Sequence, residues 1–467
     1  MLNETAVALC LCFLGVVTVA AAGPVPEAKA ERDAAAKAEQ TGDCDAALLH
    51  YETIYDSTPT TPAERVELRR KFAELHGKVK PNTDPAKAGV YKVRVYVFRT
   101  VAFGAITNTY NEEQLKDIDK ANAAWADEVW KASLGNCRLE WETVLIDKPL
   151  TSFDGFAHPR DCTPYFTDLQ PGAVDHVAVY ALTPGLPCNC WADTWGPCCR
   201  GASYVGFNDA GDGSLRSGEI QVHEWLHAIQ MTMEWHHLYP DGLLVNPDSG
   251  ANCGQDCWRP KEDGDGLYNW YRHMLTTHMT RKMWRELSLR RPPSNPWIDK
   301  LDLCPKFLAV GPFDGASLTN SGFDVAFIDE TGARPSAGKK AGDKVWREAV
   351  RGGIFLDLGR CFYPVVRQAA YVACVVQSPA EQEAQVRIGS GAGCKVWHNG
   401  KLILTHPEGR GCGLDQDNVN IKLSKGDNLF LIKIVNSGAW DWADWGATLR
   451  VTDLLGKPLP GIKYALP

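Results

Sequence analysis

The stretch QVHEWLHAI places two histidines, His223 and His227, four residues apart, with Glu224 beside the first. On an α-helix, residues four apart lie on one face, so both imidazoles can face the same metal ion. A zinc ion held there would lower the pKa of a bound water, and the neighbouring carboxylate could take its proton as the water attacks a carbonyl. The pattern predicts a Zn²⁺ site, with His223 and His227 as ligands and Glu224 as general base.

The same segment has the apolar spacing of a helix that packs on a core. Its apolar residues recur three and four positions apart, at Val222, Trp225, Leu226 and Ile229. This spacing predicts that the histidines lie on the opposite, outward face.

Residues 88 to about 290 resemble the zincin metallopeptidases through the motif His223-Glu224-Trp225-Leu226-His227. The resemblance implies a peptide or protein substrate, and it gives the two histidines and the glutamate the roles stated above. It also implies that the segment from Gly201 to Gly206 is the edge strand along which an extended peptide would pair.

The third zinc ligand separates the subfamilies of zincins. The metzincin pattern fails, because Gln230 and Met233 stand at the positions where it continues. Glu234 lies on the histidine face, but two turns of helix place it about 10 Å from His227, too far for the same metal.

The aspzincin register gives a better match for the third ligand. It places His236 at the ligand position and Tyr239 at that of the phenol that steadies the oxyanion, and His237 is almost as well placed. The family has aspartate where this chain has histidine. The third ligand stays open between His236, His237 and more distant candidates, which are Glu262, Asp265, His273, His278 and Glu286.

The elements around the motif predict an α+β chain with a zincin-like domain over residues 87–292. Period-two alternation in VYKVRVYVFR predicts a strand with Tyr91, Val93, Val95 and Val97 on one face. A capping-box start at Asn111 and Gln114 predicts a long helix that ends at Gly135. Two further strands, RLEWETVLI and AVDHVAVYAL, follow, and residues 24–86 form a short helical segment before the domain.

After the linker RRPPSNPW, residues 297–467 show short alternating runs separated by turn signals such as Asn399-Gly400, which predicts an antiparallel β-sandwich. This region resembles the galactose-binding-like jelly-roll modules of secreted hydrolases. Aromatic faces suit the apolar side of a pyranose, so Trp397, Trp440, Trp442 and Trp445 suggest a carbohydrate-stacking surface.

The net charge and the N-terminal segment limit the possible partners and the cellular location of the chain. The formal net charge of −8 argues against nucleic acid as a partner. An apolar run from Ala6 to about Ala22 predicts a signal peptide over residues 1–23, or a membrane anchor if it is retained, so the chain is expected to be secreted, periplasmic or at the cell surface. The cysteines of such an exported chain are expected to form disulfides.

The main hypothesis is an exported zinc metallopeptidase that hydrolyses peptide bonds with Glu224 as general base. One alternative is a catalytically silent scaffold whose β-sandwich binds carbohydrate or a cell-surface partner. The other is a zinc hydrolase of a non-peptide bond.

Overall fold

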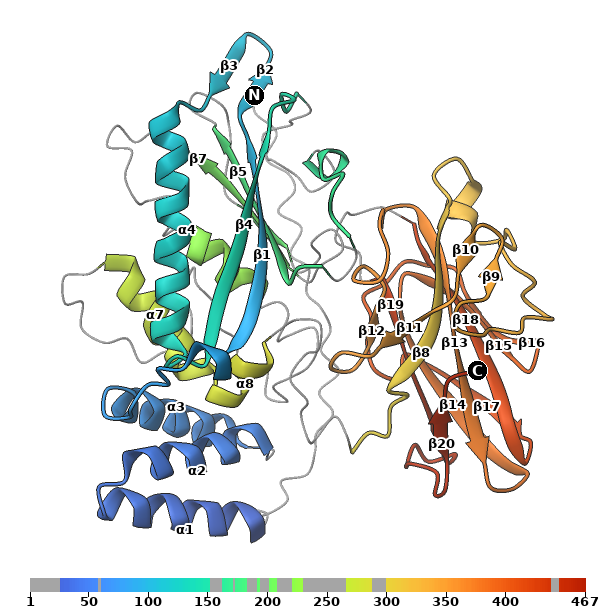
Figure 1. Ribbon diagram of the computed structural model, residues 1–467. Coiled ribbons are helices and arrows are strands. Elements are labelled where there is room, and N and C mark those ends of the chain that lie inside the picture. Colours follow the sequence, from blue (N-terminus) through green and yellow to red (C-terminus); the bar gives the residue numbers. More distant parts are fainter. Residues whose placement is uncertain are drawn as a thin grey trace, which may run out of the picture.

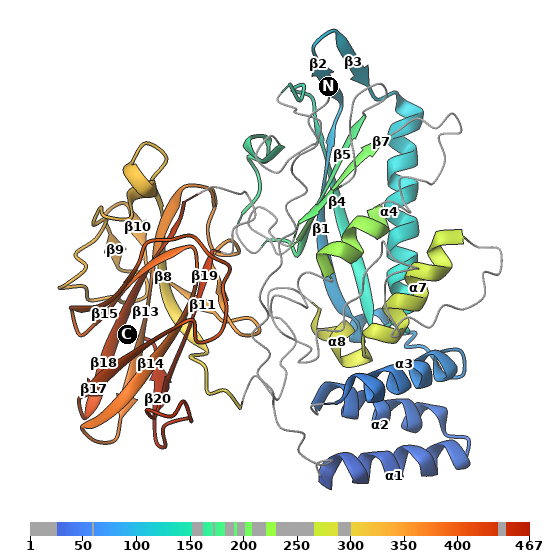
Figure 2. The same ribbon diagram turned by 180° about the vertical axis from the view of Figure 1, so that it is seen from behind.

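The computed structural model describes residues 26–57, 60–151, 162–170, 173–182, 191–193, 201–207, 221–229, 266–287, 300–437 and 445–467. Within them the chain is α+β. Helices and a mixed sheet form the N-terminal body, and antiparallel sheets form the C-terminal one (Figures 1 and 2). The predictions of an α+β chain and of a C-terminal sandwich are confirmed. Among the described helices, none is long and apolar enough to cross a membrane.

Three helices open the described chain and lie side by side as a layer (Figure 1). They are α1 (Pro26–Gln40), α2 (Cys44–Ser57) and α3 (Pro62–His76). α3 begins with a capping box, in which the backbone N–H of Glu64 donates to the Thr61 hydroxyl and the Glu64 carboxylate accepts from the Thr61 backbone. Leu68 and Phe72 of this layer are buried in the same apolar cluster as Tyr91 of the sheet.

Two later helices, α7 (Gly266–His278) and α8 (Arg281–Glu286), tie this layer to the rest of the N-terminal body. The Glu52 carboxylate accepts from the backbone N–H of Arg281 at 2.7 Å and from its Nε at 2.8 Å. The Thr280 hydroxyl lies 2.9 Å from Asp56 Oδ2, and its oxygen also caps α8. The helical layer is therefore joined to the following domain by buried polar contacts as well as by apolar packing.

The N-terminal sheet has the strand order β4-β1-β5-β7-β6, and only β6 runs antiparallel to its neighbour. The strands are β1 (Gly89–Phe98), β4 (Cys137–Ile146), β5 (His176–Leu182), β6 (Trp191–Asp193) and β7 (Gly201–Phe207). A hairpin of β2 (Thr100–Phe103) and β3 (Ile106–Thr109), and the single turns η1 (Pro85–Lys87) and η2 (Thr163–Tyr165), complete the connections.

The two faces of this sheet pack in different clusters. Tyr91, Val93 and Val95 are buried together with Trp125 of α4 (Glu112–Ala132), which has the predicted capping box at Asn111 and Gln114. Alternate residues of β1, Tyr96 and Phe98, belong to a second cluster on the opposite face. The predicted strand periodicity is confirmed.

The predicted edge strand is not an edge. β7 lies inside the sheet, because β5 pairs with it on one side and β6 on the other, with Trp191 opposite Tyr204 and Asp193 opposite Ala202. The backbone of residues 202–204 is therefore paired on both sides, and the prediction that this strand is a free edge for an extended peptide is wrong there.

The C-terminal body is a sandwich of two antiparallel sheets. One has the order β11-β8-β13-β18-β15-β16, with β20 also paired to β13, and the other has the order β12-β19-β14-β17. The first sheet comprises β8 (Lys306–Asp314), β11 (Arg347–Val350), β13 (Gln368–Ser378), β15 (Gly393–His398), β16 (Lys401–His406), β18 (Gly426–Asn436) and β20 (Lys463–Ala465). The second comprises β12 (Leu356–Asp357), β14 (Gln382–Gly391), β17 (Asp417–Leu423) and β19 (Gly446–Thr452). A small pair, β9 (Lys340–Ala341) and β10 (Lys344–Val345), lies beside them, and η4 spans Thr319–Gly322.

Most of the described cysteines are buried as small apolar residues. Free thiols are found at Cys44, Cys137, Cys304, Cys361, Cys374 and Cys394. Burial raises the pKa of Cys361 to about 12, and Cys137, Cys374 and Cys394 are also buried. The disulfide prediction is therefore wrong for these six. Cys137, Cys304, Cys374 and Cys394 are held inside the cores as thiols, whereas Cys44 and Cys361 are partly exposed. The clustered cysteines at 188–199 and 253–257 lie outside the described residues.

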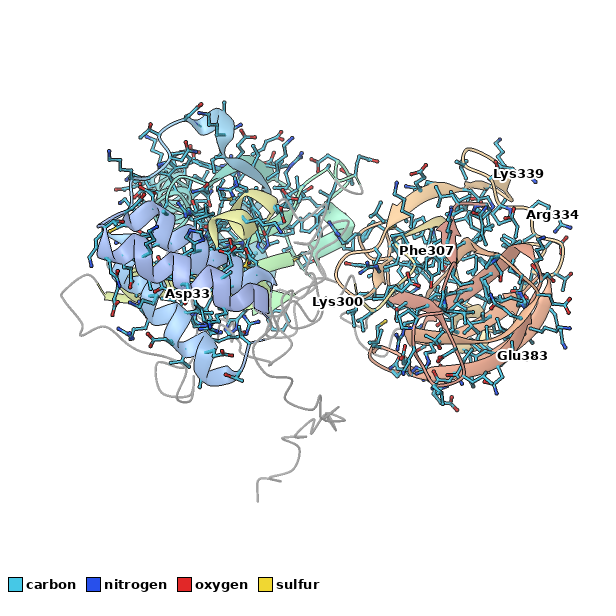
Figure 3. The ribbon with its side chains drawn as sticks, turned by 90° about the horizontal axis from the view of Figure 1, so that it is seen from below. Asp33, Lys300, Phe307, Arg334, Lys339 and Glu383 are labelled. Carbon is cyan, nitrogen blue, oxygen red and sulfur yellow. The ribbon has the colours of Figure 1, made fainter. Side chains whose placement is uncertain are left out.

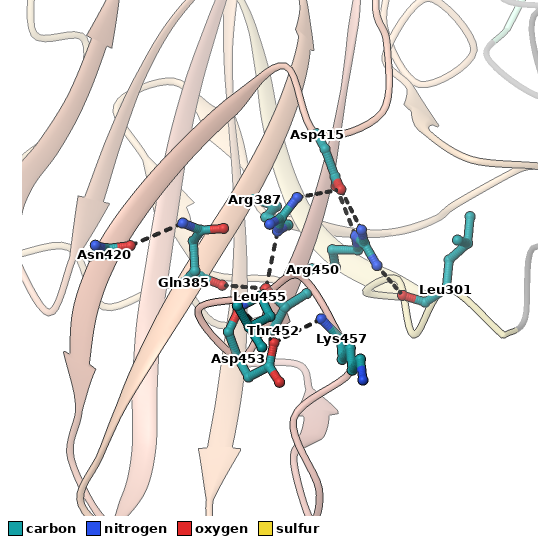
Figure 4. Close-up of polar contacts among 10 residues, drawn as sticks. All are labelled: Leu301, Gln385, Arg387, Asp415, Asn420, Arg450, Thr452, Asp453, Leu455 and Lys457. Atoms are coloured by element: carbon teal, nitrogen blue, oxygen red, sulfur yellow. Dashed lines mark hydrogen bonds and ion pairs between the residues drawn. The ribbon is translucent and has the colours of Figure 1, made fainter. Parts of the chain in front are cut away.

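An ion-pair network crosses the surface of the smaller sheet (Figure 4). Asp415 accepts hydrogen bonds from Arg387 Nη1 at 3.0 Å and from Arg450 Nε at 2.8 Å, and Arg450 also donates to the Leu301 carbonyl at 3.3 Å. Burial alone would raise the pKa of Asp415, but the hydrogen bonds and charges of Arg450 and Arg387 outweigh it and hold the pKa below its ordinary value. One carboxylate thus joins two strands and the residues that lead into the sandwich.

Replacing Asp415 by asparagine should lower the free energy of unfolding of the sandwich by about 3 kcal/mol, because two guanidinium groups lose their shared counter-charge. The folded-state pKa is lowered, so the loss should be full above the unfolded pKa and should fade as the pH drops through the folded one. Urea unfolding followed by tryptophan fluorescence measures it. Asp417→Asn, which breaks a single pair with Arg410, is the matched comparison and should cost less. Equal losses of unfolding free energy in the two variants would mean that pairing Asp415 with two arginines stabilises the sandwich no more than a single ion pair does.

Candidate functional site

The helix that carries the predicted motif spans residues 221–229 in the described chain. Val222, Trp225, Leu226 and Ile229 are fully or almost fully buried, whereas His223 and His227 are half-buried. The indole N–H of Trp225 donates to the Tyr91 hydroxyl at 3.1 Å. The predicted division of this helix into a core-facing side and a histidine side is confirmed.

The two histidines come together as their spacing predicted. Their Nε2 atoms lie 3.2 Å apart, and the rings meet edge to face with centroids 4.8 Å apart. Glu224 is buried, with 7% of its surface exposed. Two imidazoles provide half of a tetrahedral ligand set, so a zinc site would need further donors.

The described ranges do not supply those donors. Among them, no group of three or more His, Cys, Asp or Glu side chains could hold a metal ion. His278 is buried with Nδ1 3.0 Å from the Met274 carbonyl, and Glu286 lies 3.9 Å from Lys282. His273 is partly buried on α7, and its carbonyl accepts from the Thr277 hydroxyl at 2.9 Å. His236, His237, Glu262 and Asp265 lie outside the described residues, as do Glu234 and Tyr239.

A buried polar group beneath the motif was not predicted. His176 Nε2 lies 2.7 Å from the Ser203 hydroxyl, which also accepts from the Gln221 side chain. Burial lowers the pKa of His176 to about 3, so the ring is neutral, and all three residues are completely buried. A serine beside a histidine has the composition of a nucleophile and base, but no substrate reaches a fully buried hydroxyl. The group joins β5, β7 and the motif helix as a structural contact.

A groove of about 280 Å³ opens on the larger sheet of the sandwich. Leu429 and Leu431, two residues apart on β18, line one part of it. The turn between β15 and β16 lines another, where Asn399 and Gly400 have φ values of 48° and 82°, as expected for the Asn-Gly turn of a hairpin. A Cβ on Gly400 would lie 2.3 Å from the Thr331 carbonyl, so only glycine fits there. The remaining lining residues are Glu330, Thr331, Ala333 and Arg334.

Two polar side chains of the groove, Glu330 and Arg334, make hydrogen bonds within the protein. Tyr371 donates its hydroxyl hydrogen to Glu330 Oε1 at 2.7 Å, and Lys433 Nζ lies 3.6 Å from the same oxygen. Burial raises the pKa of Tyr371, so this phenol stays a donor. Within the described chain no hydrogen bond reaches Glu330 Oε2. Arg334 is exposed and projects from the sandwich (Figure 3), with Nη1 bonded to the Ala333 carbonyl at 2.9 Å.

The predicted tryptophan surface is wrong for the two members that the structure describes. Trp397 is 4% exposed and packs in the core around Tyr371, and Trp445 is 1% exposed with its indole N–H bonded to the Ile434 carbonyl at 3.2 Å. Both are core residues: Trp397 lies on β15, and Trp445 directly precedes β19 and packs in the apolar cluster between the sheets. Trp440 and Trp442 lie outside the described residues.

Comparison with known proteins gives partial likenesses to solved structures. No family model matches the chain, and no curated protein matches it. A family 35 carbohydrate binding module from an environmental isolate is 18% identical, with 29% of this chain and 86% of that chain covered and a TM-score of 0.18. The PA14 domain of MpAFP antifreeze protein is 10% identical, with 36% and 91% covered and a TM-score of 0.20. A PA14 sugar-binding domain from an RTX adhesin is 15% identical, with 18% and 44% covered and a TM-score of 0.14.

The chain spans less than half of that RTX adhesin structure and 16% of a β-glucosidase from Kluyveromyces marxianus that it also matches. Among the residues that the structure describes, no third His, Cys, Asp or Glu joins His223 and His227 in a group that could hold a metal ion. The assignment to the zincin metallopeptidases is therefore wrong for the part of the chain that the structure describes. The hydrolase activity and the Zn²⁺ cofactor are tested by no finding and stay predictions. A peptide substrate has no support either. The separate roles predicted for His223, Glu224 and His227 are tested by no finding and stay predictions.

Proposed function

We propose that the C-terminal sandwich binds carbohydrate in the groove between β18, the β15–β16 turn and residues 330–334. The observation that carries the proposal is the anchored carboxylate of Glu330 beside the partly exposed side chain of Leu429, in a groove that is also lined by Leu431, which is 2% exposed. A pyranose presents an apolar C–H face and a rim of hydroxyls. An apolar surface with a fixed acceptor beside it is complementary to both.

The other groups of the groove support the same ligand class. Arg334, Asn399 and Thr331 line the same space and carry guanidinium, amide and hydroxyl groups. A volume of about 280 Å³ is near the lower end of ligand sites, which suits one or two sugar rings. The Asn399 side-chain oxygen accepts from the Leu429 backbone N–H at 2.8 Å, so this amide is fixed before any ligand arrives.

Substitution of Glu330 by glutamine tests the groove. A glycan array on the full-length chain would first identify a bound sugar, and titration calorimetry would then give its affinity. We expect Glu330→Gln to weaken binding between tenfold and a hundredfold, because a hydrogen bond to a charged group contributes about 1.5–3 kcal/mol. Glu383→Gln, an exposed change on β14 of the other sheet, is the matched control and should leave the affinity unchanged. No glycan bound, or an unchanged affinity in Glu330→Gln, contradicts the proposal.

A further inference from the structure

The ammonium group of Lys433 is enclosed by main-chain oxygens. Its side chain has no exposed surface, and Nζ donates to the carbonyls of Gly322 at 2.9 Å, Phe323 at 2.9 Å and Val325 at 2.5 Å. An ammonium has three N–H donors and no acceptor. Three donors meet three carbonyls, so the hydrogen-bonding capacity of this buried cation is filled by one short segment of chain.

Negative charge and aromatic faces complete the enclosure. Glu330 lies 3.6 Å away, and the rings of Phe327 and Tyr371 have their centroids 5.2 and 5.7 Å from Nζ. Both the ring faces and the carboxylate attract a cation. The set of carbonyl oxygens, one carboxylate and aromatic faces is that of a cation site, and a side chain of the protein itself fills it.

The segment that supplies the carbonyls has an unfavourable backbone. Asn320, Ser321 and Gly322 have successive φ values of 47°, 52° and 77°, all in the left-handed region. Such conformations are costly for residues other than glycine and persist only where surrounding contacts impose them. A Cβ on Gly322 would lie 2.7 Å from the Phe327 ring, so the turn is also tightly closed. Contacts from outside the turn must therefore hold it.

Burial of this lysine is expensive for the fold. Desolvation lowers the pKa of Lys433 to about 8, which still leaves the amine charged at neutral pH. An apolar side chain of similar length would incur no such penalty. A charged group at this position is therefore better explained by the geometry that it imposes than by a gain in global stability.

We propose that Lys433 is a positioning residue, an internal cation that closes residues 319–330 onto the sandwich and thereby fixes Glu330 at the groove. Residues 319–330 are called the Lys433 loop below. The part of the inference that concerns ligand binding rests on the proposed carbohydrate function. The part that concerns the loop stands on the contacts of Lys433 alone.

Lys433→Met tests both parts in the full-length chain. Hydrogen exchange read by mass spectrometry should show amides of the Lys433 loop exchanging at least tenfold faster, while amides of β13 and β18 keep their rates. The melting temperature should fall, because Glu330 and three carbonyls lose their buried donor. The confinement of faster exchange to the Lys433 loop therefore distinguishes a positioning role from a general structural one. Affinity for the glycan found on the array should fall at least tenfold. Unchanged exchange in the loop, or an equal acceleration throughout the sandwich, overturns the proposal.

Lys395→Met is the matched control. Lys395 lies directly opposite Lys433 on the neighbouring strand and reaches the same loop through an ion pair of 2.8 Å with the exposed Asp324. Its loss should change loop exchange less than twofold. Adding methylammonium to Lys433→Ala should slow amide exchange in the Lys433 loop again, because this small cation can bind the carbonyl oxygens that the lysine no longer occupies. Exchange that stays fast would count against a cation site at these carbonyls. If the parent chain binds no glycan, the carbohydrate proposal fails while loop exchange still decides the role of Lys433.

Discussion

Trp225→Ala should lower the free energy of unfolding of the N-terminal body by about 4 kcal/mol, the usual cost of removing a fully buried tryptophan. Trp225 has no exposed surface, contacts the rings of Trp125 and Trp284, and donates to the Tyr91 hydroxyl. The substitution would leave a cavity between the sheet and the helix that carries His223 and His227. Urea unfolding followed by circular dichroism at the helical band measures the loss, because the α-helices described lie in this body.

Trp141→Ala is the control for this prediction. Trp141 lies on β4 of the same sheet but is 36% exposed, so its removal leaves less of a cavity and should cost well under half as much. Similar costs for the two variants would show that the motif helix is not anchored through Trp225.

Asp56→Asn should remove a pH dependence on the order of 4 kcal/mol from the same body. Burial raises the pKa of Asp56 to about 7, although the hydrogen bond from Thr280 acts in the opposite direction. The folded-state pKa lies above the unfolded value, so this carboxyl contributes stability that is full below about pH 4 and is lost as the pH rises through about 7. An asparagine keeps an acceptor for Thr280 and has no charge to desolvate.

The measurement is urea unfolding of parent and variant at pH 4.5 and at pH 8. The variant should be the more stable at pH 8, and the difference should shrink at pH 4.5. Asp45→Asn, on the same helix with a half-exposed carboxylate 3.6 Å from Arg281, should show no such pH-dependent gain. A constant difference between Asp56→Asn and the parent at both pH values would show that Asp56 ionises normally in the folded chain.

Local patterns predicted the elements of this protein well. Alternation in β1 and the apolar spacing of residues 222–229 identify which side chains face the core, because burial imposes the period of the element on the sequence. The Asn399-Gly400 turn was also predicted correctly, since the backbone conformation of such a turn favours these two residues. The order of strands was not predicted, because β1 pairs in parallel with β4 and β5, which lie far from it in the sequence, and such long-range pairing leaves no local pattern.

The sequence predicted only part of the candidate sites. Helical spacing brought His223 and His227 together correctly, but a motif of five residues does not establish the other ligands or a family. Trp397 and Trp445 were assigned to a surface from residue type alone, and only the packing of the folded sandwich shows that they are buried. Glu330 and Leu429 are about a hundred positions apart, so their meeting in one groove depends on pairing that the sequence does not display.

The layer of α1, α2 and α3 has a consequence for processing of the chain. Phe72 and Ile54 are buried in one cluster with Tyr91 of the sheet, and Glu52 and Asp56 hold the start of α8. Helices and sheet are therefore expected to melt together as one cooperative unit. Removal of α1, α2 and α3 by a protease that cuts after residue 85 is expected to destabilise the remaining domain. The product would expose apolar side chains and leave Arg281 without its buried counter-ion Glu52. These helices have the properties of a permanent part of the folded domain rather than of a removable propeptide.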